Sequence, residues 1–191
     1  MSEFKKEWLQ KADIDYFAPF LLLWLAFNSW YKDHYHDIEN PTDRKLIDLL
    51  KCNDSNRSKP FKNFKGLLER SDRLSTQFRS DLESFHRVLL SANLIHDKAK
   101  YVNLNKAIIK WESLEQESTY KDLFVDSSKK GVPKIKLIDL TMINDLPTIF
   151  AGVLECLYLF RNLLVHGHIE PNKDNNEVAE YAYKLLKAIM P

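Results

Sequence analysis

The stretch from Asp145 to Gly167, DLPTIFAGVLECLYLFRNLLVHG, decides the fold. Pro147 stands in the first turn behind an Asn144/Asp145 cap, and Gly167 stands where a left-handed residue commonly ends a helix. Nearly every residue between these signals is apolar. A helix of about five turns with this composition is expected to be covered by other helices on most of its surface. The sequence therefore predicts an all-α protein arranged around one buried helix.

Two charged residues, Glu155 and Arg161, interrupt the middle of this helix. They lie about 240° apart around the helix axis, so they do not neutralise each other. An unpaired guanidinium is costly in apolar surroundings. Arg161 must therefore meet a carboxylate from another helix or face a polar cleft, and only the second arrangement is functional.

The composition limits the number of domains and the kind of partner. The chain has 191 residues, with 28 Lys and Arg against 27 Asp and Glu. This length suits one domain with a substantial core, and we expect a single helical domain over residues 1–191. Because there is no global positive field, an anionic partner such as RNA must be held by a local patch.

Several features predict a cytoplasmic protein that is not embedded in a membrane. Cys52 and Cys156 lie far apart without zinc or redox spacing, which favours free thiols in a reducing compartment. The beginning of the chain lacks the form of a signal peptide. The most apolar run, residues 17–27, is about half as long as a membrane-spanning helix. His34 and His36 would point in nearly opposite directions on a helix, so we expect no metal site.

The remaining elements are read from apolar periodicity and from helix end signals. Residues 53–60 are rich in Asn and Ser and are expected to be a polar loop, and residues 134–137 alternate like a short extended segment. Further helices are expected at about 14–36, 42–52, 72–90, 105–117 and 176–189.

A basic stretch runs from Arg57 to Arg79, with Phe61, Phe64 and Phe78 between its cations. Such a stretch is either a solvated helix face or a surface that follows a phosphate backbone, with aromatic rings available for stacking. Asn28 is a second polar candidate, because its amide lies in an apolar helix and needs partners. It either satisfies neighbouring backbone or orients Arg161 and its neighbours. The RNA-binding candidates are Asn28, Lys59, Lys62, Lys65, Arg70 and Arg73.

Arg161, Asn162 and His166 are the residues best suited to chemistry. Arginine stabilises charge on phosphoryl oxygens and imidazole moves protons, so the set suits metal-independent cleavage of an RNA phosphodiester. On one helix Arg161 and His166 are about 140° apart, so one copy does not close a pocket. Two copies across a two-fold axis would pool these groups in one cleft. The alternative is a His that caps the helix and an Arg buried in an ion pair.

Two segments resemble a known family. Tyr158–Gly167, YLFRNLLVHG, followed by a turn at Pro171 and a closing amphipathic helix, is similar to the R-x4-6-H motif helix of HEPN-domain proteins. Leu23–Tyr31, LWLAFNSWY, is similar to the first helix of a prokaryotic branch of that superfamily. The resemblance covers residues 14–36 and 145–190. Residues 40–140 have no such counterpart and are expected to add short helices.

The resemblance implies an up-and-down helical bundle that forms a homodimer and cleaves RNA at the dimer cleft without a cofactor. It also implies a toxin or antiphage effector with a cognate antitoxin or defence partner. By the family pattern Arg161 is the phosphate-binding cation, His166 the general acid and base, and Asn162 a positioning residue. His168 stands where family members silenced by a nucleotidyltransferase carry tyrosine, which argues against that silencing.

Two other functions remain open. One is a non-catalytic module that binds RNA or protein through the basic stretch from Arg57 to Arg79. The other is a purely structural helical subunit of a defence complex. The structural alternative predicts a buried salt bridge at Arg161 and no basic cleft.

Overall fold

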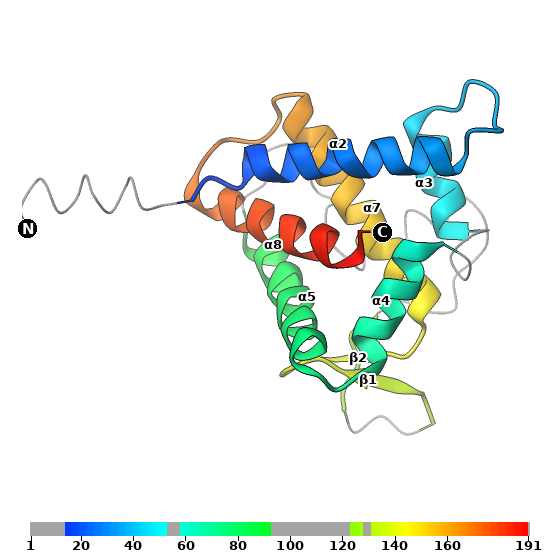
Figure 1. Ribbon diagram of the computed structural model, residues 1–191. Coiled ribbons are helices and arrows are strands. Elements are labelled where there is room, and N and C mark those ends of the chain that lie inside the picture. Colours follow the sequence, from blue (N-terminus) through cyan, green and yellow to red (C-terminus); the bar gives the residue numbers. More distant parts are fainter. Residues whose placement is uncertain (1–13, 53–57, 93–122, 128–130, 191) are drawn as a thin grey trace, which may run out of the picture.

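The computed structural model describes residues 14–52, 58–92, 123–127 and 131–190. Within these ranges the protein is mostly helical, as predicted, with six helices and one small sheet (Figure 1). The elements are α2 (Phe17–His34), α3 (Asp43–Cys52), α4 (Lys59–Glu69), α5 (Arg73–Ser91), β1 (Lys134–Lys136), β2 (Thr141–Ile143), α7 (Leu146–Val165) and α8 (Lys173–Ile189).

The central helix α7 has the ends that the sequence predicts. Asp145 caps it by accepting a hydrogen bond from the Thr148 amide at 3.2 Å, which satisfies one of the free amides of the first turn. After the last turn, Gly167 adopts a φ of 66°, and the His168 amide donates to the Leu163 carbonyl at 2.8 Å. This closing pattern fixes the direction in which the chain leaves the helix.

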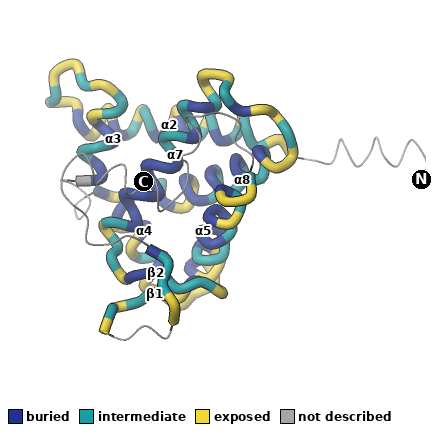
Figure 2. The backbone as a smooth tube through the Cα atoms, turned by 180° about the vertical axis from the view of Figure 1, so that it is seen from behind, coloured by how far each residue is buried: buried dark blue, intermediate teal, exposed yellow. Residues whose placement is uncertain are grey.

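Other helices surround α7. It packs against α3, α4 and α2 and is buried along most of its length (Figure 2). Among the described residues, α7 is the one helix long and apolar enough to span a membrane, but 61% of its most apolar window is buried inside the protein. Packing in the core therefore accounts for its apolar composition.

The flanking helices contribute one apolar face each. From α2, Phe20 packs on Phe160 of α7, with 5.3 Å between the ring centroids. Phe61 and Phe64 of α4 both contact Phe150 near the start of α7. The closing helix α8 packs against both α2 and α5. These contacts join α2 and α8, the first and last described helices, in one core.

The small sheet is fastened to α5 by Glu83. Strands β1 and β2 are antiparallel, and the turn between them presents three consecutive amides, of Ile138, Asp139 and Leu140, to Glu83 Oε2 at 2.9 to 3.1 Å. Arg87 Nη2 donates to Glu83 Oε1 at 2.7 Å. Burial alone would raise the pKa of Glu83, but Arg87 and the three amides outweigh it and lower the pKa to about 2. The carboxylate therefore stays charged while it holds the hairpin.

Most of the predicted helices are confirmed, and three local expectations need correction. The expected polar loop ends earlier, because α4 begins at Lys59 behind a Ser58 cap. Strand β2 was not expected, and α8 begins at Lys173 rather than at 176. The helix expected at 105–117 lies outside the described residues.

Candidate functional site

Arg161 lies near the end of α7 and has two side-chain partners. Its Nη1 donates to Asn162 Oδ1 at 2.8 Å, and its Nη2 is 3.6 Å from Asp43 Oδ2. The Arg161 side chain keeps 21% of its surface exposed. Arg161 therefore meets a carboxylate from another helix, and part of its guanidinium also reaches solvent.

Asp43 is the junction of a polar network between α2, α3 and α7. As the first residue of α3, it accepts a hydrogen bond from Asn28 Nδ2 at 3.0 Å through Oδ2, and its Oδ1 lies 3.5 Å from Lys32 Nζ. Asn28 also donates to the hydroxyl of Tyr31. Asn28 thus connects the first helix to Arg161 through their common partner Asp43. Both of these partners of Asn28 are side chains.

Tyr31 forms the buried floor of this network. Its side chain is fully buried, and burial raises the pKa of its hydroxyl well above the usual range. The negative charge of Asp43 raises this pKa further, while the positive charge of Arg161 opposes the shift. Tyr31 therefore stays a neutral hydroxyl and serves as a fixed hydrogen-bonding group.

The other mid-helix charge, Glu155, fastens α3 to α7. Glu155 is fully buried, and it accepts from Arg44 Nη1 at 2.7 Å and from Lys51 Nζ at 2.6 Å. Burial lowers the pKa of Arg44, but its contacts with Glu155 and Asp48 outweigh this effect and raise it. Both charged residues in the middle of α7 thus bind α3, and this attachment holds Asp43 beside Arg161.

His166 follows the last residue of α7 and is exposed to solvent. Its amide donates to the Asn162 carbonyl at 3.1 Å, and its ring centroid lies 6.2 Å from that of His168. Five residues separate His166 from Arg161, or about 7.5 Å along a helix axis. The structure brings Arg161, Asn162 and Asn28 together around Asp43, and it places the exposed His166 imidazole further along the chain, just after the end of α7.

Five cations of the basic stretch are exposed, but its aromatic rings are not. Phe61, Phe64 and Phe78 are 3%, 0% and 2% exposed, so the expectation that they are available for stacking is wrong. Their spacing reflects the core-facing sides of α4 and α5. The exposed cations are Lys59, Lys62, Lys65, Arg70 and Arg73.

These cations lie toward the opposite end of α7 from Arg161. The helix that carries most of them, α4, packs on Phe150 through Phe61 and Phe64. Phe150 precedes Arg161 by eleven residues, or about 16 Å along the helix. The structure therefore does not gather the two sets of candidates into one site within a single chain.

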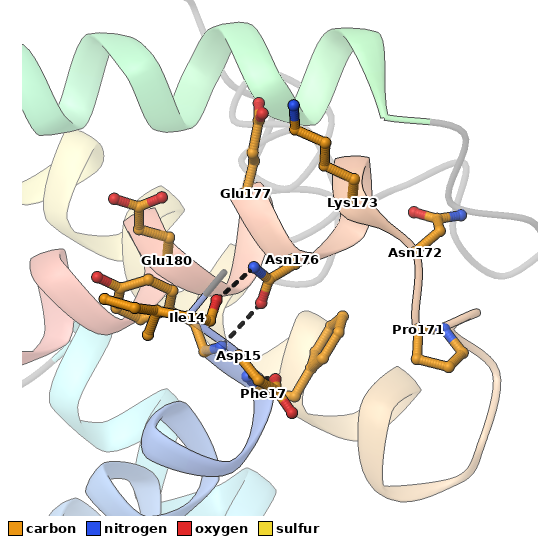
Figure 3. A pocket seen from close by; sticks show the side chains of 10 residues that line it. Ile14, Asp15, Phe17, Pro171, Asn172, Lys173, Asn176, Glu177 and Glu180 are labelled. Carbon is orange, nitrogen blue, oxygen red and sulfur yellow. Dashed lines mark hydrogen bonds between the residues drawn. The ribbon is translucent and has the colours of Figure 1, made fainter. Parts of the chain in front are cut away.

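A hollow that the sequence did not indicate lies between the beginnings of α2 and α8 (Figure 3). It measures about 540 Å³ and is lined by residues 14–17 and by residues of the segment from Pro171 to Glu180. Asn176 closes one side, because its Oδ1 accepts from the Tyr16 amide and its Nδ2 donates to the Ile14 carbonyl, both at 2.8 Å. None of the sequence-predicted site residues lines this hollow.

In the part of the chain that the structure describes, no group of three His, Cys, Asp or Glu side chains is placed to hold a metal ion. Comparison with known proteins gives no relative: no family model, no curated protein and no solved structure matches the chain.

Proposed function

We propose that this protein is a metal-independent endoribonuclease of the HEPN type, acting as a toxin or antiphage defence effector. One observation carries the proposal. The partly exposed guanidinium of Arg161, held by Asn162 and Asp43, and the exposed imidazole of His166 occupy the same end of α7. An arginine and a histidine are sufficient to stabilise a phosphoryl group and to transfer protons.

In the proposed reaction the 2'-hydroxyl of the RNA attacks the adjacent phosphorus and the 5'-oxygen leaves. A His166 imidazole takes the proton from the attacking 2'-hydroxyl, and a protonated His166 gives a proton to the 5'-oxygen as it leaves. Arg161 stabilises the charge that builds on the phosphoryl oxygens, and a guanidinium can offer them two parallel hydrogen bonds. Asn162 keeps the guanidinium in place through the 2.8 Å hydrogen bond to its Oδ1.

The proposal requires two copies of the chain. On one helix the two residues diverge by about 140° and lie about 7.5 Å apart along the axis. A second α7 related by a two-fold axis would place the Arg161 of one copy near the His166 of the other. The exposure of both side chains leaves them accessible to such a partner.

The Asp43 ion pair also gives some support to a structural role for Arg161. A structural pair is expected to be buried and close, whereas this one has an Nη2 to Oδ2 distance of 3.6 Å and side chains exposed by 21% and 26%. Exposed pairs of this kind contribute about 0.2 to 1 kcal/mol. A phosphate group could replace Asp43 as the partner of Arg161 at a small cost in free energy. This weak pairing favours a phosphate-binding role for Arg161 over a structural one.

A second candidate function is RNA binding without cleavage. The exposure of Lys59, Lys62, Lys65, Arg70 and Arg73 favours it, because these cations project from α4 and the start of α5. With the neighbouring rings buried, such binding would be electrostatic and strongly dependent on salt.

The deciding experiment incubates the purified protein with single-stranded and structured RNAs in EDTA, beside the Arg161→Ala and His166→Ala variants. Cleavage by the wild type alone is the expected result. Salt-dependent binding without product would favour the second function, and equal cleavage by His166→Ala would refute the assignment of the site.

A further inference from the structure

The outward face of α2 carries no charged side chain over four turns. Between Asp15 and Lys32 every residue is uncharged, although the helix lies along one edge of the bundle (Figure 1). Leu22 is 66% exposed and Leu25 is 60% exposed. Ala18, Ala26 and Ser29 are exposed on the same side.

This face is unusual for a helix in contact with water. A surface helix normally opposes its apolar face with charged and polar residues. Single exposed leucines need no explanation, but a continuous apolar strip commonly marks an interaction surface. The strip contains small residues on either side of its two leucines, which lets another helix approach closely.

The strip is complementary to itself when two copies run antiparallel. In such a pair, the residue numbers of two positions that face each other always add up to the same sum. If Leu22 faces Leu25 of the partner subunit, this sum is 47, and Ala18 then faces Ser29 of the partner subunit. Asp15 lies two residues before α2, so the same register brings it toward the end of the partner helix that carries Lys32 of the partner subunit, and opposite charges meet at both ends.

We propose that α2 is the surface through which two copies of this chain associate, packed antiparallel about a two-fold axis between Leu22 and Leu25. Self-complementary order is what a two-fold interface requires, because every contact occurs twice. A partner of another kind would have no need of this symmetry in the positions of the leucines, the small residues and the end charges.

This interface deepens the proposed function, and its link to a shared cleft rests on that function. Asn28, which binds Asp43, lies one turn beyond Leu25 on the adjoining side of α2. In the proposed register the Asn28 residues of the two copies are nine positions apart, or about 14 Å along the helices. The two Arg161 networks would then border one groove.

Sedimentation across a concentration series tests the association. The wild type is expected to form dimers, and Leu25→Asp is expected to weaken the dimer at least tenfold by burying a charge at the axis. Leu74→Asp is the matched control, because Leu74 is 73% exposed on α5, away from the strip. A wild type that stays monomeric, or equal weakening by both variants, would overturn the proposal.

Disulfide crosslinking tests the register. In a Cys52→Ser background, a mixture of Ala18→Cys and Ser29→Cys chains should form a mixed disulfide. Neither variant alone should do so, because its own two cysteines would lie about 16 Å apart along the helices. Crosslinking of either variant alone would refute the antiparallel register.

The RNA assay separates the two proposals. A crosslinked dimer that does not cleave RNA would uphold the interface and remove the nuclease function. A cleaving protein that remains dimeric with Leu25→Asp would uphold the nuclease and refute this interface.

Discussion

Arg161 Nη2 of α7 lies 3.6 Å from Asp43 Oδ2 of α3, in a pair that is only partly shielded from water. The same carboxylate accepts a hydrogen bond from Asn28 and lies near Lys32. Because Asp43 is shared among three groups, its ion pair with Arg161 is weak. This contact orients the guanidinium. Under the proposed ribonuclease function, the carboxylate would compete with an RNA phosphate for the same donors.

Asp43→Asn is therefore expected to lower the KM for RNA by about 1.4-fold to fivefold, which corresponds to the ~0.2 to 1 kcal/mol of an exposed pair. The amide keeps the shape of the side chain and removes the charge that repels phosphate. Steady-state cleavage of a short labelled RNA measures this change.

Asp48→Asn is the matched control on α3, because Asp48 pairs with Arg44 and Lys51 rather than with Arg161. It should cost stability without lowering KM. A KM that is unchanged in Asp43→Asn, or lowered equally in both variants, would contradict competition at Arg161.

The sequence predicted the position of Arg161 better than its partner. The helix ends at Asp145 and Gly167 are encoded by local backbone preferences, so they could be predicted from a few residues. The need of Arg161 for a partner also followed from its apolar surroundings. That the partner is Asp43 could not be predicted, because the contact depends on how α3 packs on α7, and this packing is set by Glu155 with Arg44 and Lys51.

His166→Ala is expected to reduce the rate of RNA cleavage by about a hundredfold to ten-thousandfold, the usual range for loss of a general acid or base. Stability should change little, because the imidazole is exposed. Single-turnover rates and thermal unfolding of the same preparation measure both quantities. His168→Ala should retain cleavage, and a comparable loss in both variants would argue against a specific role for His166.

Glu155→Gln is expected to destabilise the protein by about 2 to 3 kcal/mol. The substitution removes the carboxylate charge that Lys51 contacts, and Lys51 is fully buried, so its positive charge is poorly compensated in a region shielded from water. Asp48 remains 2.7 Å from Lys51 Nζ, which keeps the loss below that of an isolated buried charge. Urea unfolding measures the difference.

A double variant tests whether the uncompensated charge of Lys51 causes this loss of stability. Glu155→Leu alone leaves the Lys51 charge buried, whereas Glu155→Leu with Lys51→Met removes both buried charges, so the double variant should be the more stable of the two. Glu69→Gln is the surface control, because Glu69 lies 3.8 Å from Lys65 with both side chains about half exposed. If Glu69→Gln lowers the free energy of unfolding as much as Glu155→Gln, burial of the charge is not the cause of the loss.

For the basic stretch the sequence left two interpretations open, a solvated helix face and a phosphate-binding surface with rings available for stacking. The alternation of cations with Phe61, Phe64 and Phe78 resembles a nucleic-acid surface, but on a helix the same spacing places charges outward and rings inward. Because α4 was not predicted, the sequence did not show that the rings face the core. The Ser58 cap and Pro60 in the first turn are helix-start signals that would have shown which residues face the core.

Lys62→Ala with Lys65→Ala is expected to weaken RNA binding by an equal factor for different sequences and to lower the salt dependence of the affinity. Both side chains are exposed on α4, and neither contacts the Arg161 network. Binding titrations at several salt concentrations measure the slope. An unchanged slope would remove these cations from the RNA-binding surface.

Glu83→Gln is expected to destabilise the protein by about 2 kcal/mol at neutral pH, with a smaller effect in acid. The pKa of Glu83 is about 2 in the folded protein and near 4.5 when unfolded. The unfolded chain therefore takes up the proton first as the pH falls, so the stabilisation is complete above about pH 5 and lost progressively toward pH 2.

Urea unfolding of the wild type and of Glu83→Gln across this pH range should show their free energies of unfolding converging as the pH falls. Asp139→Asn, at a carboxylate that is 75% exposed and 3.4 Å from Arg87, should follow the wild type throughout. A constant gap between wild type and Glu83→Gln would mean that the shape of the side chain, and not its charge, holds the hairpin.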